Sequence, residues 1–199
     1  MKEEKKSGFI NKLLLSLSVI MLLVGVGIVG KVLYTEYVRI KDTDLLLQEA
    51  QTITKEKIPR SEFDPQNGDV VGTVSIPSQG MVVPITEGTD DASLVASAGH
   101  ETVTHWPGDG QQIFLAGHRN TEFGVLQYMK PGDEIIMDMP YGTYTYVVTE
   151  MKVVPETEVS VIKPNDKYPK DQLVLMTCYP FTFGADTAER YLVYAELKE

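Results

Sequence analysis

Short β-rich runs interrupted by glycine and proline fill most of this 199-residue chain after residue 68. The runs are 70–76, 81–85, 113–116, 134–139, 143–149, 173–178 and 191–197. Runs of this length between Gly- and Pro-containing turns are typical of strands. Packed into about 130 residues, they favour a small closed β-barrel over a layered α/β fold. Pro84 predicts that the second run is an edge strand, and short helices are expected over 93–98 and 124–129.

The N-terminus indicates the compartment. From Leu13 to Gly30 the chain is apolar apart from two serines, and Val32-Leu33 extends the run. About 20 such residues are needed for a helix to cross the hydrocarbon of a membrane. No small-residue cleavage site follows, so an uncleaved anchor is favoured over a removed signal peptide. An excess of lysine before the run predicts a cytoplasmic N-terminus and an extracellular domain.

The predicted organisation therefore has four parts. Residues 1–12 are the cytoplasmic N-terminus, and residues 13–33 are the transmembrane anchor. Residues 34–68 are a stalk and linker, which begins with a charged helical stretch and ends in a segment containing two prolines and an Asn-Gly pair. Residues 69–199 form the extracellular β-barrel domain, which also carries the candidate catalytic residues.

Composition argues against two classes of partner. A formal net charge of -10 argues against nucleic acid, because phosphate binding requires clustered Lys and Arg. The three histidines and the single cysteine are not at the spacing of a zinc site. A calcium site built from loop carboxylates stays open, because the chain has 28 acidic residues.

Cys178 is the only cysteine, and it ends the apolar run Leu173-Val-Leu-Met-Thr-Cys178. Outside the cytoplasm, a cysteine without an intramolecular partner is either part of the core or a nucleophile. Burial statistics alone favour the core. Its place at the end of a strand, where a rigid element meets a loop, favours the nucleophile.

A thiol nucleophile needs a group that transfers protons and a donor for the developing oxyanion. His118 follows the apolar run 113–116 and a glycine, so it lies at a strand end as the thiol does. Arg190 stands 12 residues after the cysteine. If the strands of the two residues were antiparallel neighbours, Arg190 would lie beside Cys178. Taken alone, His118 and Arg190 could each have a purely structural role. Arg119 is the rival arginine. Because it directly follows His118, its side chain is predicted to point to the opposite side of the strand end.

The other two histidines, His100 and His105, lack a comparable preceding strand. We interpret both as loop residues. His100 could still contribute to the wall of a surface cleft around the thiol.

Three blocks of this sequence together resemble the active-site blocks of the sortases, the cysteine transpeptidases of Gram-positive bacteria. They are Leu115-Ala-Gly-His-Arg119, Leu175-Met-Thr-Cys-Tyr-Pro-Phe181 and Glu189-Arg-Tyr-Leu-Val193. The resemblance runs from about residue 69 to 197 and implies a closed eight-stranded β-barrel. It further implies that Cys178 is the nucleophile, His118 the general acid and base, and Arg190 the stabiliser of the oxyanion, with no cofactor.

Finer features are most similar to class D sortases of spore-forming bacilli and clostridia. These features are Cys178-Tyr-Pro-Phe181, and Ala98-Gly-His100 ahead of Trp106-Pro-Gly108. Val174 stands where the family's Thr-Leu-x-Thr-Cys pattern has its first threonine. No segment resembles the lid of pilus-building sortases.

The resemblance implies a membrane-anchored transpeptidase whose substrates are proteins with a C-terminal Leu-Pro-x-Thr-Gly or Leu-Pro-x-Thr-Ala sorting signal. The threonine carbonyl would pass through a thioacyl enzyme to an amine of the peptidoglycan precursor. Residues 155–171 would form the substrate loop. Two alternatives stay open: a thiol peptidase that releases its acyl group to water, and a non-catalytic wall-binding β-domain.

Overall fold

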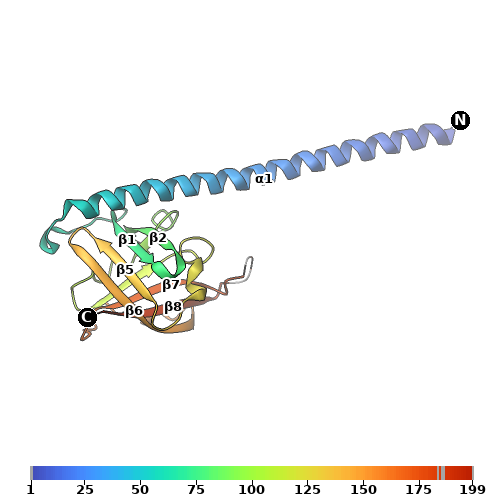
Figure 1. Cartoon of the computed structure of the whole chain (residues 1–199). Coiled ribbons are helices and arrows are strands. Elements are labelled where there is room, and N and C mark those ends of the chain that lie inside the picture. Colours follow the sequence, from blue (N-terminus) through green and yellow to red (C-terminus); the bar gives the residue numbers. More distant parts are fainter. Residues whose placement is uncertain (1, 183, 185–186, 199) are drawn as a thin grey trace. The chain divides into compact units, whose positions relative to one another are not determined.

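The computed structural model describes residues 2–182, 184 and 187–198 (Figure 1). The chain forms two compact units, Met1–Lys41 and Asp42–Glu199. Helix α1 (Lys2–Glu56) begins in the first unit and ends in the second. It contains residues 34–56, where the sequence predicted a helix.

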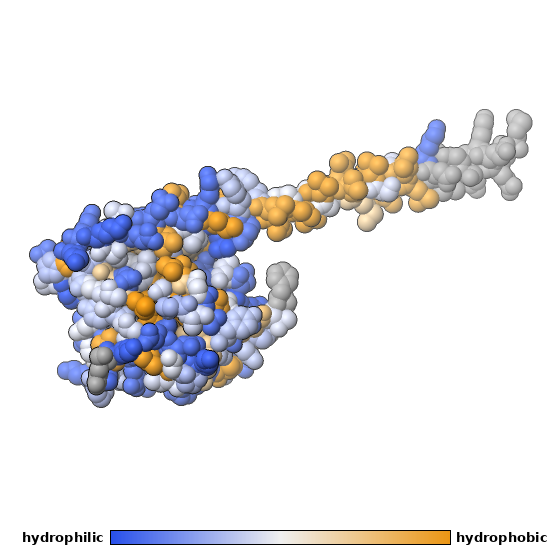
Figure 2. All heavy atoms as spheres, viewed as in Figure 1, coloured by the Kyte–Doolittle hydropathy of each residue, from blue (hydrophilic) through white to orange (hydrophobic). Residues whose placement is uncertain are grey.

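Residues 13–30 of α1 are apolar apart from two serines. Figure 2 shows apolar residues covering this stretch, and their side chains pack against nothing in the structure. The helix is long and apolar enough to cross a membrane. In the second unit, α1 has a buried residue, Ala50, and the chain after it is fixed by a hydrogen bond from the Ile58 amide to the Pro140 carbonyl (3.1 Å).

Eight strands form a closed barrel with the neighbour order β1-β2-β3-β4-β7-β8-β6-β5, in agreement with the predicted fold. They are β1 (Val70–Ile76), β2 (Met81–Glu87), β3 (Ala98–His100), β4 (Gln112–Ala116), β5 (Glu134–Met139), β6 (Gly142–Pro155), β7 (Gln172–Tyr179) and β8 (Glu189–Leu197). The pairs β2–β3 and β4–β7 are parallel, and the other pairs are antiparallel. Four short 3₁₀ helices lie between strands or before them: η1 (Arg60–Glu62), η2 (Pro77–Gln79), η3 (Gly124–Tyr128) and η4 (Val159–Val161).

The parallel strands β4 and β7 are apolar along their length because both of their faces are covered. Their inward side chains, such as Leu115 and Leu175, belong to the barrel core. Their outward side chains, Phe114 and Val174, form a second apolar cluster with Leu192 of β8. Val161 and Ile162, from the loop between β6 and β7, pack on this cluster. Burial on both faces explains why the sequence of these strands shows little alternation.

Three predictions about the fold are wrong or incomplete. Residues 93–98 are not a helix: the Asp90 carboxylate accepts hydrogen bonds from the amides of Ala92 and Ser93, which makes a side-chain-stabilised turn. The run 98–100 is instead strand β3, which was missed because it is short and contains a glycine. Gly99 is required there, since an added Cβ would lie 2.4 Å from the Gly88 carbonyl oxygen.

Strand β2 is also not an edge strand. It pairs with β1 on one side and with β3 on the other. Pro84 is tolerated because the pairing with β3 begins only at Ile85. The short helix expected over 124–129 is present as η3.

Candidate active site

The strand pairing brings Cys178 and Arg190 together. In the antiparallel pair of β7 and β8, Cys178 is directly opposite Arg190, as the sequence predicted for neighbouring antiparallel strands. The neighbouring residues Leu175 of β7 and Val193 of β8 point into the core. By strand alternation, the thiol and the guanidinium therefore lie on the outer face of the barrel. Both residues are half-buried.

His118 reaches the same level from the other side of β7. In the parallel pair of β4 and β7, Ala116 is opposite Met176, so two residues further on His118 corresponds to Cys178. Two hydrogen bonds extend this pairing past the end of β4: Gly117 N donates to the Met176 carbonyl (3.0 Å), and Thr177 Oγ1 donates to the Gly117 carbonyl (2.7 Å). The exposed His118, just past the end of β4, thus lies at the level of Cys178 on β7 and Arg190 on β8.

The chain around His118 has little conformational freedom. A Cβ at Gly117 would lie 2.7 Å from the Phe123 ring, so a side chain there would displace the buried phenylalanine. The His118 carbonyl accepts a hydrogen bond from Phe123 N (3.0 Å), which closes the turn after the histidine. Thr177 and Phe123 were not predicted as supports of the site, although Thr177 directly precedes the cysteine.

Arg190 is held by three acceptors. Its Nη1 donates to the carbonyls of Thr187 and Glu189, the latter at 3.0 Å. Its Nη2 donates to Glu156 Oε2 at 3.0 Å. Glu156, just after β6, was not predicted. Glu189 contacts the guanidinium through its backbone carbonyl.

The rival arginine, Arg119, is half-buried and also contacts the cysteine segment. Its Nη1 donates a hydrogen bond to the carbonyl of Pro180, two residues after the thiol. This contact joins the turn after His118 to the loop after β7, which the sequence analysis did not predict.

On the inner side of β7, three aromatic residues close this end of the barrel. Tyr179 stacks on Tyr191 with ring centroids 6.1 Å apart, and Phe181 meets Tyr191 edge-on at 5.3 Å. Burial raises the pKa of Tyr191, and the neighbouring Tyr179 adds to the effect, so this phenol stays protonated at neutral pH.

His100 is not a loop residue and does not contribute to the cleft wall. It ends β3 opposite Leu115, is fully buried and stacks on Trp106 with ring centroids 3.7 Å apart. Its Nδ1 lies 2.8 Å from Glu87 Oε2, and its Nε2 donates to the His105 carbonyl at 3.0 Å. This histidine is therefore part of the barrel interior.

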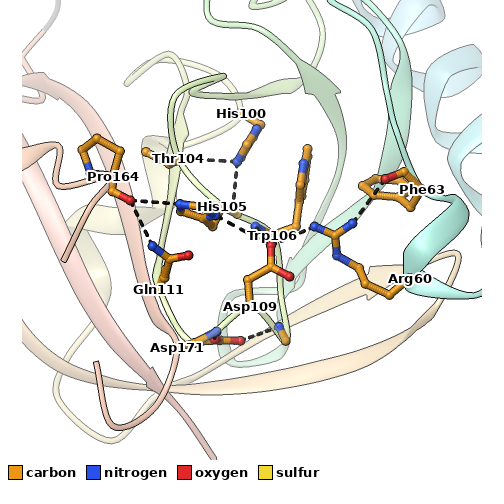
Figure 3. A network of polar contacts seen from close by, with 12 residues as sticks. Arg60, Phe63, His100, Thr104, His105, Trp106, Asp109, Gln111, Pro164 and Asp171 are labelled. Carbon is orange, nitrogen blue, oxygen red and sulfur yellow. Dashed lines mark hydrogen bonds and ion pairs between the residues drawn. The ribbon is translucent and has the colours of Figure 1, made fainter. Parts of the chain in front are cut away.

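His105 does lie in a loop, as expected, and Figure 3 shows the polar network that it joins. His105 Nε2 and Gln111 Nε2 both donate to the Pro164 carbonyl, at 2.9 and 3.2 Å. The buried Asp171 carboxylate accepts from the amides of Gly108 and Gly110, at 2.6 Å each. These contacts fix the loop between β6 and β7 against the segment before β4.

The same network continues to the chain segment after α1. Asp109 pairs with Arg60 at 2.8 Å, and the guanidinium of Arg60 also lies 5.6 Å from the centre of the Phe63 ring (Figure 3). The polar side of the loop between β6 and β7 is thus joined through residues 105–111 to η1, while its apolar side packs on Phe114 and Val174.

Within the described ranges, no group of three or more His, Cys, Asp or Glu side chains could hold a metal ion. A cavity of about 400 Å³ lies between the end of α1 and the turn from β5 to β6, lined among others by Lys57, Pro140 and Tyr141. None of the three candidate catalytic residues lines it.

Comparisons with known proteins identify the family of this chain. The sortase domain family model matches residues 74–198. Sortase D of Bacillus subtilis (strain 168) is 33% identical over 137 residues, which is 69% of this chain and 68% of that protein. Sortase A of Listeria monocytogenes is 32% identical over 133 residues, which is 65% of this chain and 57% of that protein.

Solved structures share the fold. A sortase D5 transpeptidase of Clostridium perfringens has a TM-score of 0.67 at 23% identity, over 79% of this chain and 98% of that chain. Sortase C of Clostridium perfringens with the C-terminal cell wall sorting motif has a TM-score of 0.61 at 26% identity. The match covers 80% of this chain and 90% of that chain. The chain therefore belongs to the sortase family of cysteine transpeptidases and is class D-like.

Proposed function

We propose that this sortase cleaves a C-terminal Leu-Pro-x-Thr-Gly or Leu-Pro-x-Thr-Ala signal and joins the threonine carbonyl to an amine of the peptidoglycan precursor. The observation that carries the proposal is the placement of Cys178 on β7 directly opposite Arg190 on β8, with His118 two residues past the end of the neighbouring strand β4. Membership of a family that attaches proteins to the cell wall supports the class of reaction. A relative solved with the C-terminal cell wall sorting motif supports the class of substrate.

In the proposed mechanism, the thiol proton of Cys178 passes to His118, and the sulfur attacks the threonine carbonyl. The charge that develops on the carbonyl oxygen is stabilised by N–H groups of Arg190. The tetrahedral intermediate collapses as His118 gives its proton to the departing amine, which leaves a thioacyl enzyme. The acceptor amine then attacks this thioester, His118 takes the amine proton and returns it to the departing sulfur, and Cys178 leaves as the thiol.

The reaction is tested by mixing residues 42–199, one of the two compact units, with a panel of sorting-signal peptides. We expect intact-mass spectrometry to show a thioacyl adduct on Cys178 for the matching peptides. Adding an amine should convert the adduct into an amide product. A product that is only the free acid would identify a thiol peptidase, and the absence of any adduct would support a non-catalytic binding domain.

We further infer that residues 13–33 anchor the protein in the membrane, with residues 1–12 in the cytoplasm and the catalytic domain, 69–199, outside on the stalk and linker 34–68. The long apolar helix and the lysines before it support this orientation. Protease added to intact protoplasts is expected to digest the domain after Lys57, as followed with an antibody to the domain. Full protection of the domain, with digestion only after the protoplasts are lysed, would contradict the orientation.

A further inference from the structure

We propose that Glu156 is a positioning residue that orients the guanidinium of Arg190 for catalysis. This proposal rests on the role proposed above for Arg190 as the donor to the oxyanion. It assigns a function to a carboxylate that directly follows β6 and that none of the three active-site blocks contains.

The backbone of Glu156 is fixed to the strand that carries Arg190. In the antiparallel pair of β6 and β8, Val154 is directly opposite Arg190, and the pairing continues to Pro155. Glu156 N then donates to the Ala188 carbonyl at 2.8 Å, which extends the ladder by one more residue. Because Glu156 stands two residues after Val154, strand alternation places both on the same face, the face of Arg190.

The contacts of Arg190 leave two donors for a substrate. A guanidinium has five N–H groups in one plane. Two on Nη1 donate to the carbonyls of Thr187 and Glu189, and one on Nη2 donates to Glu156. The N–H on Nε and the second N–H on Nη2 have no acceptor within the described part of the chain. Contacts on two nitrogens fix the plane of the group, and with it the direction of the remaining donors.

The ion pair itself adds little to stability. The side chains of Arg190 and Glu156 are 24% and 49% exposed, and pairs that are open to solvent contribute little to folding. Its effect lies in the orientation of the guanidinium. Thr187 and Glu189 belong to the chain that enters β8, whereas Glu156 is the partner that β6 provides. Without Glu156, the guanidinium would be held on the β8 side alone.

The proposal is tested with Glu156→Ala in the 42–199 unit, using Glu150→Ala as the matched control. Glu150 lies on β6 itself, is 50% exposed and pairs with Lys152 at 2.8 Å, without contacting Arg190. We expect Glu156→Ala to lower kcat for acylation by Leu-Pro-x-Thr-Gly peptide about ten-fold, less than the 10²–10³ typical for loss of an oxyanion donor. KM and the thermal midpoint should not change. Glu156→Gln keeps an acceptor and should recover most of the rate, and Glu150→Ala should match wild type.

The same change in an Arg190→Ala background separates the two proposals. If Glu156 acts through Arg190, Glu156→Ala will cause no further loss there. Equal losses in both backgrounds, or a wild-type rate for Glu156→Ala alone, would overturn the positioning role while leaving the reaction intact. A wild-type rate for Arg190→Ala alone would overturn the role of Arg190 itself.

Discussion

Replacement of Cys178 by alanine is expected to abolish both cleavage of a sorting peptide and its transfer to an amine. The barrel should still fold, because the thiol is half-buried at a strand end and the core of β7 consists of Leu173 and Leu175. His118→Ala should fail at nearly the same level, because groups that act in one step have non-additive effects. Chromatography of the peptide products measures turnover, and a thermal melt confirms that each variant is folded.

The double variant Cys178→Ala with His118→Ala provides the control, since it should be no worse than either single variant. Turnover by folded Cys178→Ala would show that another group is the nucleophile.

Arg190→Lys is expected to lose most of the transpeptidation rate at an unchanged thermal midpoint. Lysine keeps the charge but replaces a planar set of donors with one flexible ammonium. It cannot reproduce the contacts of Arg190 with Glu156 and two carbonyls while also binding the oxyanion. Loss of one well-placed donor typically costs about 10²–10³ in rate, or roughly 3–4 kcal/mol.

Arg119→Lys is the matched control for this change. The structure shows Arg119 donating to the backbone carbonyl of Pro180, an acceptor that a lysine can also reach. We therefore expect this variant to stay near the wild-type rate on the same sorting peptide. If Arg119→Lys lost its activity while Arg190→Lys remained within a few-fold of wild type, Arg119 would be the arginine that acts on the substrate.

The strands that could be predicted from the sequence are those with a strong local signal. β1 and β5 begin and end at the predicted residues, because proline or glycine stands close to at least one end of each. β6 continues six residues past its predicted end at Thr149 to Pro155. That extension is mostly exposed and lacks alternation, and it is a strand because it pairs with β8. β3 pairs along only three residues, too few for any periodic signal.

The same distinction, between local signals and long-range pairing, applies to the residues of the candidate site. Cys178, His118 and Arg190 could be proposed because each stands at the end of an apolar or β-rich run, a local feature of the sequence. The support of Arg190 by Glu156 depends on a pairing across 34 residues, and that of Gly117 by Thr177 on one across 60. His100 was misplaced because β3 is too short to give a local signal, and its partner Glu87 lies opposite it only when β2 and β3 pair.

The parallel pairing of β4 and β7 has a consequence for the order in which the site is assembled during folding. Cys178 and Arg190 are 12 residues apart on an antiparallel hairpin, whereas 60 residues separate His118 from Cys178. The entropic cost of loop closure rises with chain separation, and non-local pairings form slowly. Cys178 and Arg190 can therefore meet early, while His118 joins them only when the barrel closes. Under the proposed mechanism, a chain that has not finished folding would carry the thiol of Cys178 without its proton-transfer partner, so the chemistry would begin only when the fold is complete.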